Sequence, residues 1–271
     1  MGRGSNTHTE TAGRRRSKAR HVHRSLIKGL GERDWLLQNR DGINYYLDEG
    51  HVDGARLLDR IEGLIAETHP RLRERLDFVV IPYADYNEVR PIDPEEIPHQ
   101  GAVVAAQGGR NNGQGILCLW GRRTSEYPVD DPNLSLEIIE HELAHVSTDD
   151  HSVPQELRLR WQQAREDDLT AQQQLPALEM QTQVVRVQGI RRRFEREHPW
   201  INHYPSGLPD FERQLREDWA ESMSFYLSSE RNHGLTSETG EQMDFAIYYP
   251  HRSQLLDEWL GSEPKAANTP D

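Results

Sequence analysis

Two residue types are scarce in this chain of 271 residues. Cys118 is the only cysteine, which excludes an internal disulfide and any cluster of cysteines around a metal ion. It lies in an apolar segment, so we expect a buried and unreactive thiol. Lysine occurs only three times among the 32 basic residues, so arginine carries nearly all of the positive charge.

Long apolar runs and an excess of basic residues are also absent. No stretch approaches the ~18 consecutive apolar residues of a transmembrane helix. The N-terminus lacks the apolar segment of a secretory signal peptide. We therefore expect a cytoplasmic protein without membrane contact. Export by a route that needs no signal peptide is the alternative. The net charge of −13 argues against binding nucleic acid through a broad surface, because phosphates would be repelled.

The chain is expected to form one domain between two disordered ends. Residues 1–22 are rich in Gly, Ser, Thr and Arg and form a basic arm in this interpretation, and residues 261–271 form a tail. The arm is the one segment expected to reach nucleic acid or an acidic partner, although most such runs are simply solvated. Residues 23–260 are long enough for a single domain, which we assign to the α+β class.

The first part of the domain predicts strands around one helix. Apolar residues recur at helical spacing over 52–68. β-branched and aromatic residues over 77–83 predict a strand. Two apolar runs, 101–107 and 115–121, flank a segment dense in turn residues and predict a β-hairpin. Together these elements predict a small, mostly antiparallel sheet.

The C-terminal half is predicted to be largely helical. One helix is expected over 133–148, another over 211–228 and a last one over 252–260. Between them, the charged segment 154–197 is predicted to be a helical insert broken near Pro176. It is either a helical hairpin packed on the domain or a mobile lid or partner-binding element.

The predicted helix 133–148 carries an H-E-x-x-H pattern. His141 and His145 are four residues apart and therefore lie on one helix face, where two imidazoles can bind one zinc ion (Zn2+). Glu142 is turned to the side, where it can act as a base on a metal-bound water. Two surface histidines in a charged helix are the alternative. Apolar residues on most sides of this helix argue for burial, and buried polar groups without partners are costly.

One candidate for the third metal ligand is His151. It lies six residues after His145, and the spacing resembles the H-E-x-x-H-x-x-G-x-x-H motif of the metzincins. Thr148 stands where that class has glycine. A β-branched residue is poorly suited to the sharp helix exit that the glycine allows.

The other candidate is Glu217, in the R-E-D-W-A-E-S segment that spans 216–222. Glu221 follows one turn later, and the same helix face carries the small residues Ala220 and Ser224. Such a face can pack closely against the H-E-x-x-H helix and bring Glu217 to the metal ion. Glu221 can then hydrogen-bond a liganding histidine. Ordinary surface glutamates on an amphipathic helix are the alternative.

H-E-L-A-H followed by E-D-W-A-E resembles the gluzincin class of metallopeptidases, including anthrax lethal-factor-like catalytic domains and predicted bacterial zinc peptidases. The resemblance covers residues 77–228 and implies a zincin-like fold, with a small sheet beside the active-site helix and a strand that binds substrate in extended form. It implies Glu217 as third zinc ligand and Glu221 as its supporting acid. The spacing between His145 and Glu217 is longer than usual in that class, and the insert 154–197 accounts for it.

The sequence therefore predicts a zinc-dependent metallopeptidase that hydrolyses a peptide or protein substrate, with Glu142 as general base. Two alternatives remain: a protease dedicated to one protein, such as a toxin, effector or regulator-cleaving enzyme, and a non-catalytic metal-binding scaffold. The intact Glu142 argues against the scaffold. Four residues are candidates for stabilising the oxyanion: His203, Tyr204, Tyr226 and His251.

Overall fold

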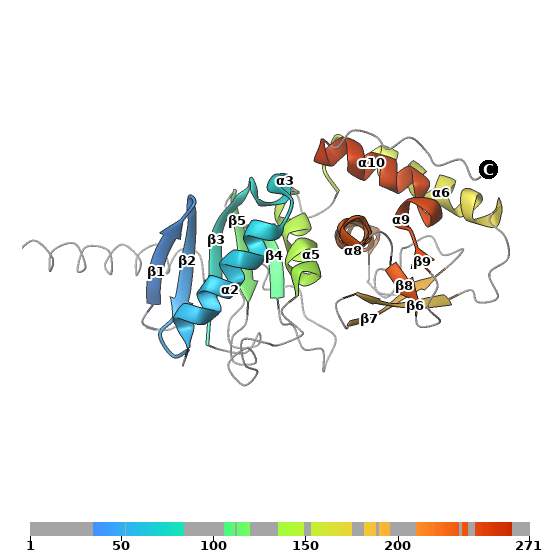
Figure 1. The fold of residues 1–271 in the computed structure, drawn as a ribbon. Helices are drawn as coiled ribbons and strands as arrows, with labels where there is room; N and C mark the ends of the chain where they lie inside the picture. The colour runs from blue at the N-terminus through green and yellow to red at the C-terminus, as the bar shows by residue number, and fades with distance from the viewer. Residues whose placement is uncertain are drawn as a thin grey trace, which may run out of the picture.

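The protein combines two sheets with a set of helices, as the computed structural model in Figure 1 shows. The structure describes residues 35–51, 53–83, 106–111, 113–119, 135–148, 153–174, 182–187, 190–195, 210–232, 235–237 and 242–261. This mixed arrangement agrees with the predicted α+β class. The proposed basic arm and nearly all of the proposed C-terminal tail lie outside these residues.

The secondary-structure elements fall into three groups. The first sheet contains β1 (Trp35–Arg40), β2 (Ile43–Asp48), β3 (Leu76–Ile81), β4 (Ala106–Asn111) and β5 (Gln114–Leu119). The second sheet contains β6 (Thr182–Val187), β7 (Ile190–Glu195), β8 (Leu235–Ser237) and β9 (Gln242–Met243). The helices are α2 (Gly54–Glu67), α3 (Pro70–Arg73), α5 (Leu136–Val146), α6 (Arg158–Gln174), α8 (Phe211–Asn232), α9 (Phe245–Tyr248) and α10 (Pro250–Leu260).

The first sheet is mixed, so the prediction of a mostly antiparallel sheet is wrong. Its strand order is β1-β2-β3-β5-β4. The two outer pairs, β1 with β2 and β4 with β5, are antiparallel, whereas β2 with β3 and β3 with β5 are parallel. The physical reason is the crossover: α2 and α3 carry the chain from β2 back to the start of β3, and such connections join parallel strands.

The β1–β2 hairpin was not predicted, although the sequence contains a signal for it. Asp41-Gly42 separates the two strands, and both residues have positive φ, 49° and 85°. Positive φ at both central residues is the requirement of the tight turn that Asp-Gly favours in hairpins.

The β4–β5 hairpin is confirmed, but its strands are shifted toward the expected turn. Gly108 pairs with Leu117 and Asn111 pairs with Gln114, so most of the predicted loop is strand. Gly108 is there because of close packing: an added Cβ would lie 1.8 Å from the carbonyl oxygen of Glu142 on α5. A glycine inside a strand often marks such a close approach. Residues 101–105 of the predicted first strand lie outside the described part.

The prediction of a helical insert over 154–197 is wrong for its second half. The helix α6 occupies much of the first half, but β6 and β7 form an antiparallel hairpin, and β6 also pairs with β8. Four of the six residues of β6 are Thr or Val. Their branched Cβ atoms favour a strand, and this outweighs the mostly helical spacing of the apolar residues between Ala177 and Phe194, which had favoured a helix.

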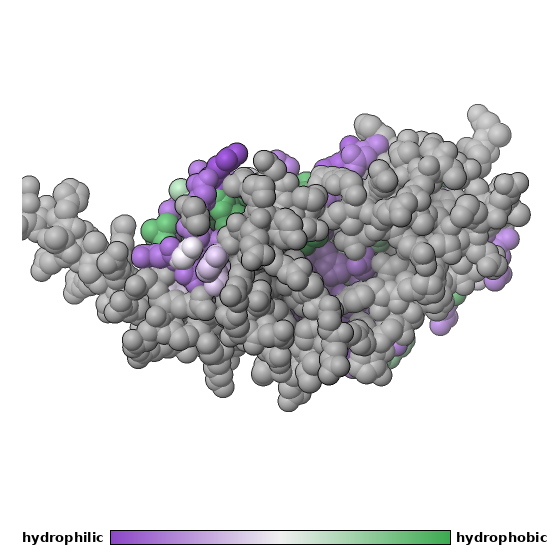
Figure 2. All heavy atoms as spheres, turned by 90° about the horizontal axis from the view of Figure 1, so that it is seen from below, coloured by the Kyte–Doolittle hydropathy of each residue, from purple (hydrophilic) through white to green (hydrophobic). Residues whose placement is uncertain are grey.

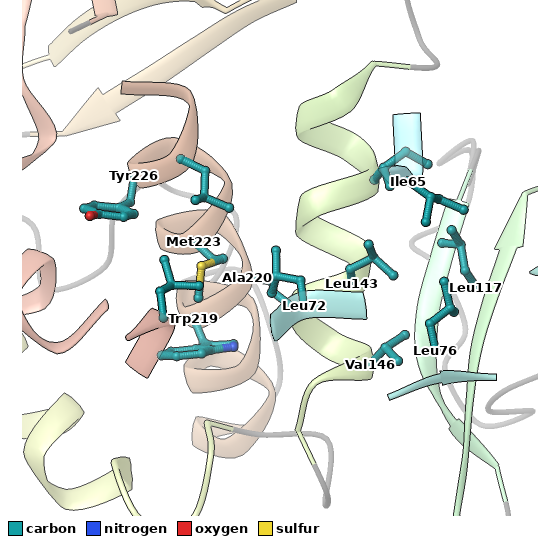
Figure 3. Close-up of a cluster of buried hydrophobic side chains, with 14 of the residues drawn as sticks. Ile65, Leu72, Leu76, Leu117, Leu143, Val146, Trp219, Ala220, Met223 and Tyr226 are labelled. Atoms are coloured by element: carbon teal, nitrogen blue, oxygen red, sulfur yellow. The ribbon is translucent and has the colours of Figure 1, made fainter. Parts of the chain in front are cut away.

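The two motif-bearing helices lie next to each other in the middle of the molecule. α5 lies between the first sheet and α8 (Figure 1). Figure 3 shows that Leu143 and Val146 of α5 point toward Leu76 and Leu117 of the sheet, whereas Ala220 of α8 faces α5. The large residues of α8 are packed on its far side in the same view: Trp219, Met223 and Tyr226. The prediction that the small-residue face of α8 packs against the H-E-x-x-H helix is confirmed.

In the part of the chain that the structure describes, no helix is both long enough and apolar enough to cross a membrane. On the face shown in Figure 2, the described residues are coloured mostly as hydrophilic, with a few hydrophobic ones among them. Among the residues that the structure describes, the exposed large apolar side chains come from different elements: Leu36 of β1, Leu159 of α6, Phe211 of α8 and Ile247 of α9.

Candidate metal centre

Contacts along their length hold α5 and α8 together. The Ser224 hydroxyl on α8 donates to the backbone oxygen of Glu137 on α5, at 3.0 Å. Further along, Arg231 of α8 forms a two-pronged ion pair with Glu140 of α5, with Nη2 and Oε2 2.9 Å apart. These contacts fix the position of α8 along α5. Side chains on the facing sides of the two helices can therefore meet in the space between the helices.

Three side chains converge at this helix pair, in agreement with the sequence prediction of where they would meet. His141 Nε2 and His145 Nε2 are 3.2 Å apart. Glu217 Oε2 lies 3.3 Å from His141 Nε2 and 3.5 Å from His145 Nε2. The three atoms therefore form a nearly equilateral triangle. The side chains are largely buried, with exposed fractions of 12% for His141, 3% for His145 and 12% for Glu217.

The size of this triangle can be compared with a zinc site. Ligand atoms about 2.0–2.2 Å from a tetrahedral ion lie about 3.3–3.6 Å from one another. The observed separations of 3.2–3.5 Å match one face of such a tetrahedron. Two imidazoles and one carboxylate are also a donor set of catalytic zinc sites, which keep the fourth position open. The group can therefore hold a metal ion, and other divalent first-row ions accept the same donors.

The two histidines have different partners on their other ring nitrogen. His141 Nδ1 lies 3.6 Å from Glu221 Oε1. His145 Nδ1 instead accepts a hydrogen bond from Arg216 Nε, at 3.2 Å. One histidine thus faces a carboxylate and the other a guanidinium.

The charges of the cluster are strongly coupled. Burial lowers the pKa of His141, but the hydrogen bond to Glu217 and the charges of Glu221 and Glu142 outweigh it and raise that pKa to about 9. Burial lowers the pKa of His145 to about 4, with Arg216 contributing in the same direction. Without a metal ion, a proton on His141 therefore supplies the positive charge that the carboxylates require. A divalent cation can supply it instead.

Glu217 is held in its charged form by the two histidines. Burial acts to raise the pKa of Glu217, but its electrostatic interaction with His145 and its hydrogen bond with His141 outweigh it and lower that pKa well below its usual range. An ionised carboxylate is the form that binds a metal ion.

Glu142 lies beside the cluster and contacts the first sheet. Its carboxylate accepts a hydrogen bond from the backbone N–H of Gly108 on β4. Burial raises the pKa of Glu142 to about 7, with His141 opposing the shift and Glu217 adding to it. A carboxylate that titrates near neutral pH can both accept and return a proton.

Gly108 belongs to β4, the edge strand of the first sheet on this side. Its N–H donates to Glu142, and its carbonyl oxygen accepts a hydrogen bond from Arg216 Nη2 at 3.4 Å. Both helices therefore engage the backbone of β4 at this residue. A side chain there would collide with α5.

Two of the oxyanion candidates are placed elsewhere. The hydroxyl of Tyr226 donates to Asp257 of α10, and Figure 3 shows its ring on the side of α8 that faces away from α5. The side chain of His251 is exposed on α10, and its backbone N–H donates to Asp168 Oδ1 at 2.8 Å. The structure does not bring either residue to the cluster. The remaining predicted site residues lie outside the described part: His151, His203 and Tyr204.

The sequence analysis missed Arg216 and Gly108. For Arg216 there was a usable signal, because Arg216, Ala220 and Ser224 follow one another at four-residue spacing. Arg216 therefore belongs to the face of α8 that meets α5. For Gly108 the signal was ambiguous, since glycine next to glycine is also typical of a turn.

The cluster is distinctive within the described residues. It is the one group there of three or more His, Cys, Asp or Glu side chains whose ligand atoms lie near enough to hold a metal ion, all within 4.8 Å of one another. No protein-family model, curated protein or solved structure matches this chain.

Proposed function

We propose that this chain is a zinc-dependent metallopeptidase with a zincin-like catalytic centre. The observation that carries the proposal is the triangle of His141, His145 and Glu217, whose dimensions suit a tetrahedral zinc ion. Its location supports the same function, because Glu142, a carboxyl with a pKa of about 7, lies beside it and an edge strand lies next to the helix that bears it.

In this proposal each residue has a separate task. His141, His145 and Glu217 hold the ion. Zinc, when bound, polarises the substrate carbonyl and lowers the pKa of a bound water molecule toward neutral pH. Glu142 takes a proton from the attacking water and returns it to the leaving amine nitrogen. Glu221 faces His141 Nδ1 and orients that ring.

The environment of Glu142 favours an enzyme over a scaffold that only binds metal. A site that only binds metal needs no further carboxyl beside those that bind the ion or orient its ligands. In an enzyme, a carboxyl with a pKa of about 7 is suited to carry a proton in both directions. The backbone N–H of Gly108 holds this carboxyl in place.

The test compares the protein with Glu142→Gln after purification without chelators. Both proteins should contain about one zinc ion per chain. Only the unmodified protein should cleave members of a peptide library, read by mass spectrometry. Absence of zinc, together with no uptake on titration, would overturn the proposed metal site. Cleavage at equal rates by both proteins would exclude Glu142 as the base.

A further inference from the structure

The contact between Arg216 and His145 determines which ring nitrogen of this histidine carries a proton. Arginine can only donate hydrogen bonds. Because Arg216 Nε donates to His145 Nδ1 at 3.2 Å, Nδ1 must be the acceptor. A neutral imidazole has one N–H, which is then on Nε2. There it faces Glu217 Oε2, 3.5 Å away, while His141 Nε2 lies 3.2 Å from the same nitrogen.

This tautomer of His145 does not suit metal binding, although the spacing of the three side chains does. A metal ion bound at the triangle needs the lone pair of His145 Nε2, and in the tautomer just described that position carries the proton. His141 is different, because its Nδ1 faces the carboxylate of Glu221, 3.6 Å away. A carboxylate favours the N–H on Nδ1, so the proton that His141 gives up on loading is the one on Nε2.

We propose that Arg216 is a positioning residue that holds His145 in the tautomer unable to bind metal, and that metal loading displaces its guanidinium from His145. This inference rests on the proposed metal site. On loading, the single imidazole proton moves through solvent from Nε2 to Nδ1, and the ring stays neutral. Nδ1–H and the Nε–H of Arg216 would then be two donors facing each other, so their contact breaks.

The structure provides a partner that keeps the displaced guanidinium nearby. Arg216 Nη2 already donates to the carbonyl oxygen of Gly108, at 3.4 Å. Arg216 itself is buried, with an exposed fraction of 6%. Metal loading is thereby coupled to Gly108 of β4. The backbone N–H of this same residue donates to the Glu142 carboxylate.

The test variant is Arg216→Lys. Lysine keeps the positive charge but has a methylene group where arginine has Nε, so it has no donor opposite His145 Nδ1. Because a hydrogen bond from a charged donor no longer opposes loading, the variant should bind zinc about tenfold more tightly. Affinity is measured by competition with a chromophoric zinc chelator. Thermal unfolding of the metal-free proteins checks that the variant is folded.

A second variant, Arg216→Met, separates the hydrogen bond from the charge. If repulsion by the charge were the only effect, Arg216→Met would bind zinc more tightly and Arg216→Lys would match the unmodified protein. That outcome would overturn the inference while leaving the metal site intact. Failure of the unmodified protein to bind zinc would overturn the inference together with the proposed function.

A measurement on the unmodified chain provides the same test without relying on a folded variant. Nitrogen-15 NMR of histidine-labelled protein distinguishes the two imidazole tautomers, and His145→Gln identifies the signal. The metal-free protein should show His145 protonated on Nε2, and zinc should move the proton to Nδ1. A proton already on Nδ1 before zinc is added would overturn the inference.

Discussion

The affinity for zinc should depend on pH over a range that His141 sets. Burial lowers the pKa of His141, but Glu217, Glu221 and Glu142 together raise it to about 9. Zinc needs the unprotonated Nε2 of this ring. Since the protonated form dominates below about pH 9, zinc must displace a proton there, and affinity falls as the pH falls below that value.

The expected size of the loss in zinc affinity follows from the pKa of His141. Each pH unit below about 9 costs about 1.36 kcal/mol, or about tenfold in affinity, so the loss between pH 8 and pH 6 is about 100-fold. His145 adds no loss over this interval, because burial and Arg216 lower its pKa to about 4. An ordinary exposed pair of histidines, each with a pKa of about 6.5, would contribute almost no dependence above pH 7.5.

Competition titrations between pH 6 and pH 9 measure this profile, and calorimetry in buffers of different ionisation enthalpy counts the protons released. Glu221→Gln is the matched comparison, because it removes one of the carboxylates that raise the pKa of His141. Its profile should level off at a lower pH. Ionisation of a zinc-bound water affects both proteins, so the difference between them reports His141. Identical profiles would refute the electrostatic reasoning.

Three further outcomes follow from the same contacts. Glu142→Gln should retain zinc but lose about 10²–10⁴ in the rate of peptide hydrolysis, measured with a validated substrate, and a wild-type rate would contradict its role. Glu217→Ala should lose most of the zinc affinity, whereas Glu221→Ala should lose about 10–100-fold, and equal losses in zinc titrations would contradict the assigned roles. Gly108→Ala should reduce the free energy of unfolding by about 1–3 kcal/mol in urea, because its Cβ would lie 1.8 Å from the Glu142 oxygen. Gly63→Ala, on α2 with nothing within 4 Å of the added Cβ, is the control and should not destabilise.

The candidate site could be predicted from sequence where local spacing decides the geometry. His141 and His145 share a helix face because they are four residues apart, and so do Glu217 and Glu221. The meeting of the two helices was also predictable, since small residues at the same spacing on α8 allow α5 to come close. Ala220 now lies between them.

Other features depend on contacts between distant segments, and the sequence pattern did not reveal them. Gly108 resembles a turn residue until α5 is placed against β4. Arg216 resembles a surface charge until its contacts with His145 and Gly108 bury it. The sequence predicts a helix for the β6–β7 segment because a few apolar residues follow helical spacing. The β-branched residues of β6 and its pairing with β8 favour strands instead.

The most direct test of the metal centre is a crystal structure of the zinc-loaded protein with anomalous diffraction at the zinc edge. The account predicts one anomalous peak about 2.0–2.2 Å from His141 Nε2, His145 Nε2 and a Glu217 carboxylate oxygen. A peak bound by His151 while Glu217 points away from it would contradict Glu217 as the proposed third ligand and favour the metzincin-like interpretation of the motif. No peak at the two histidines would contradict the account as a whole.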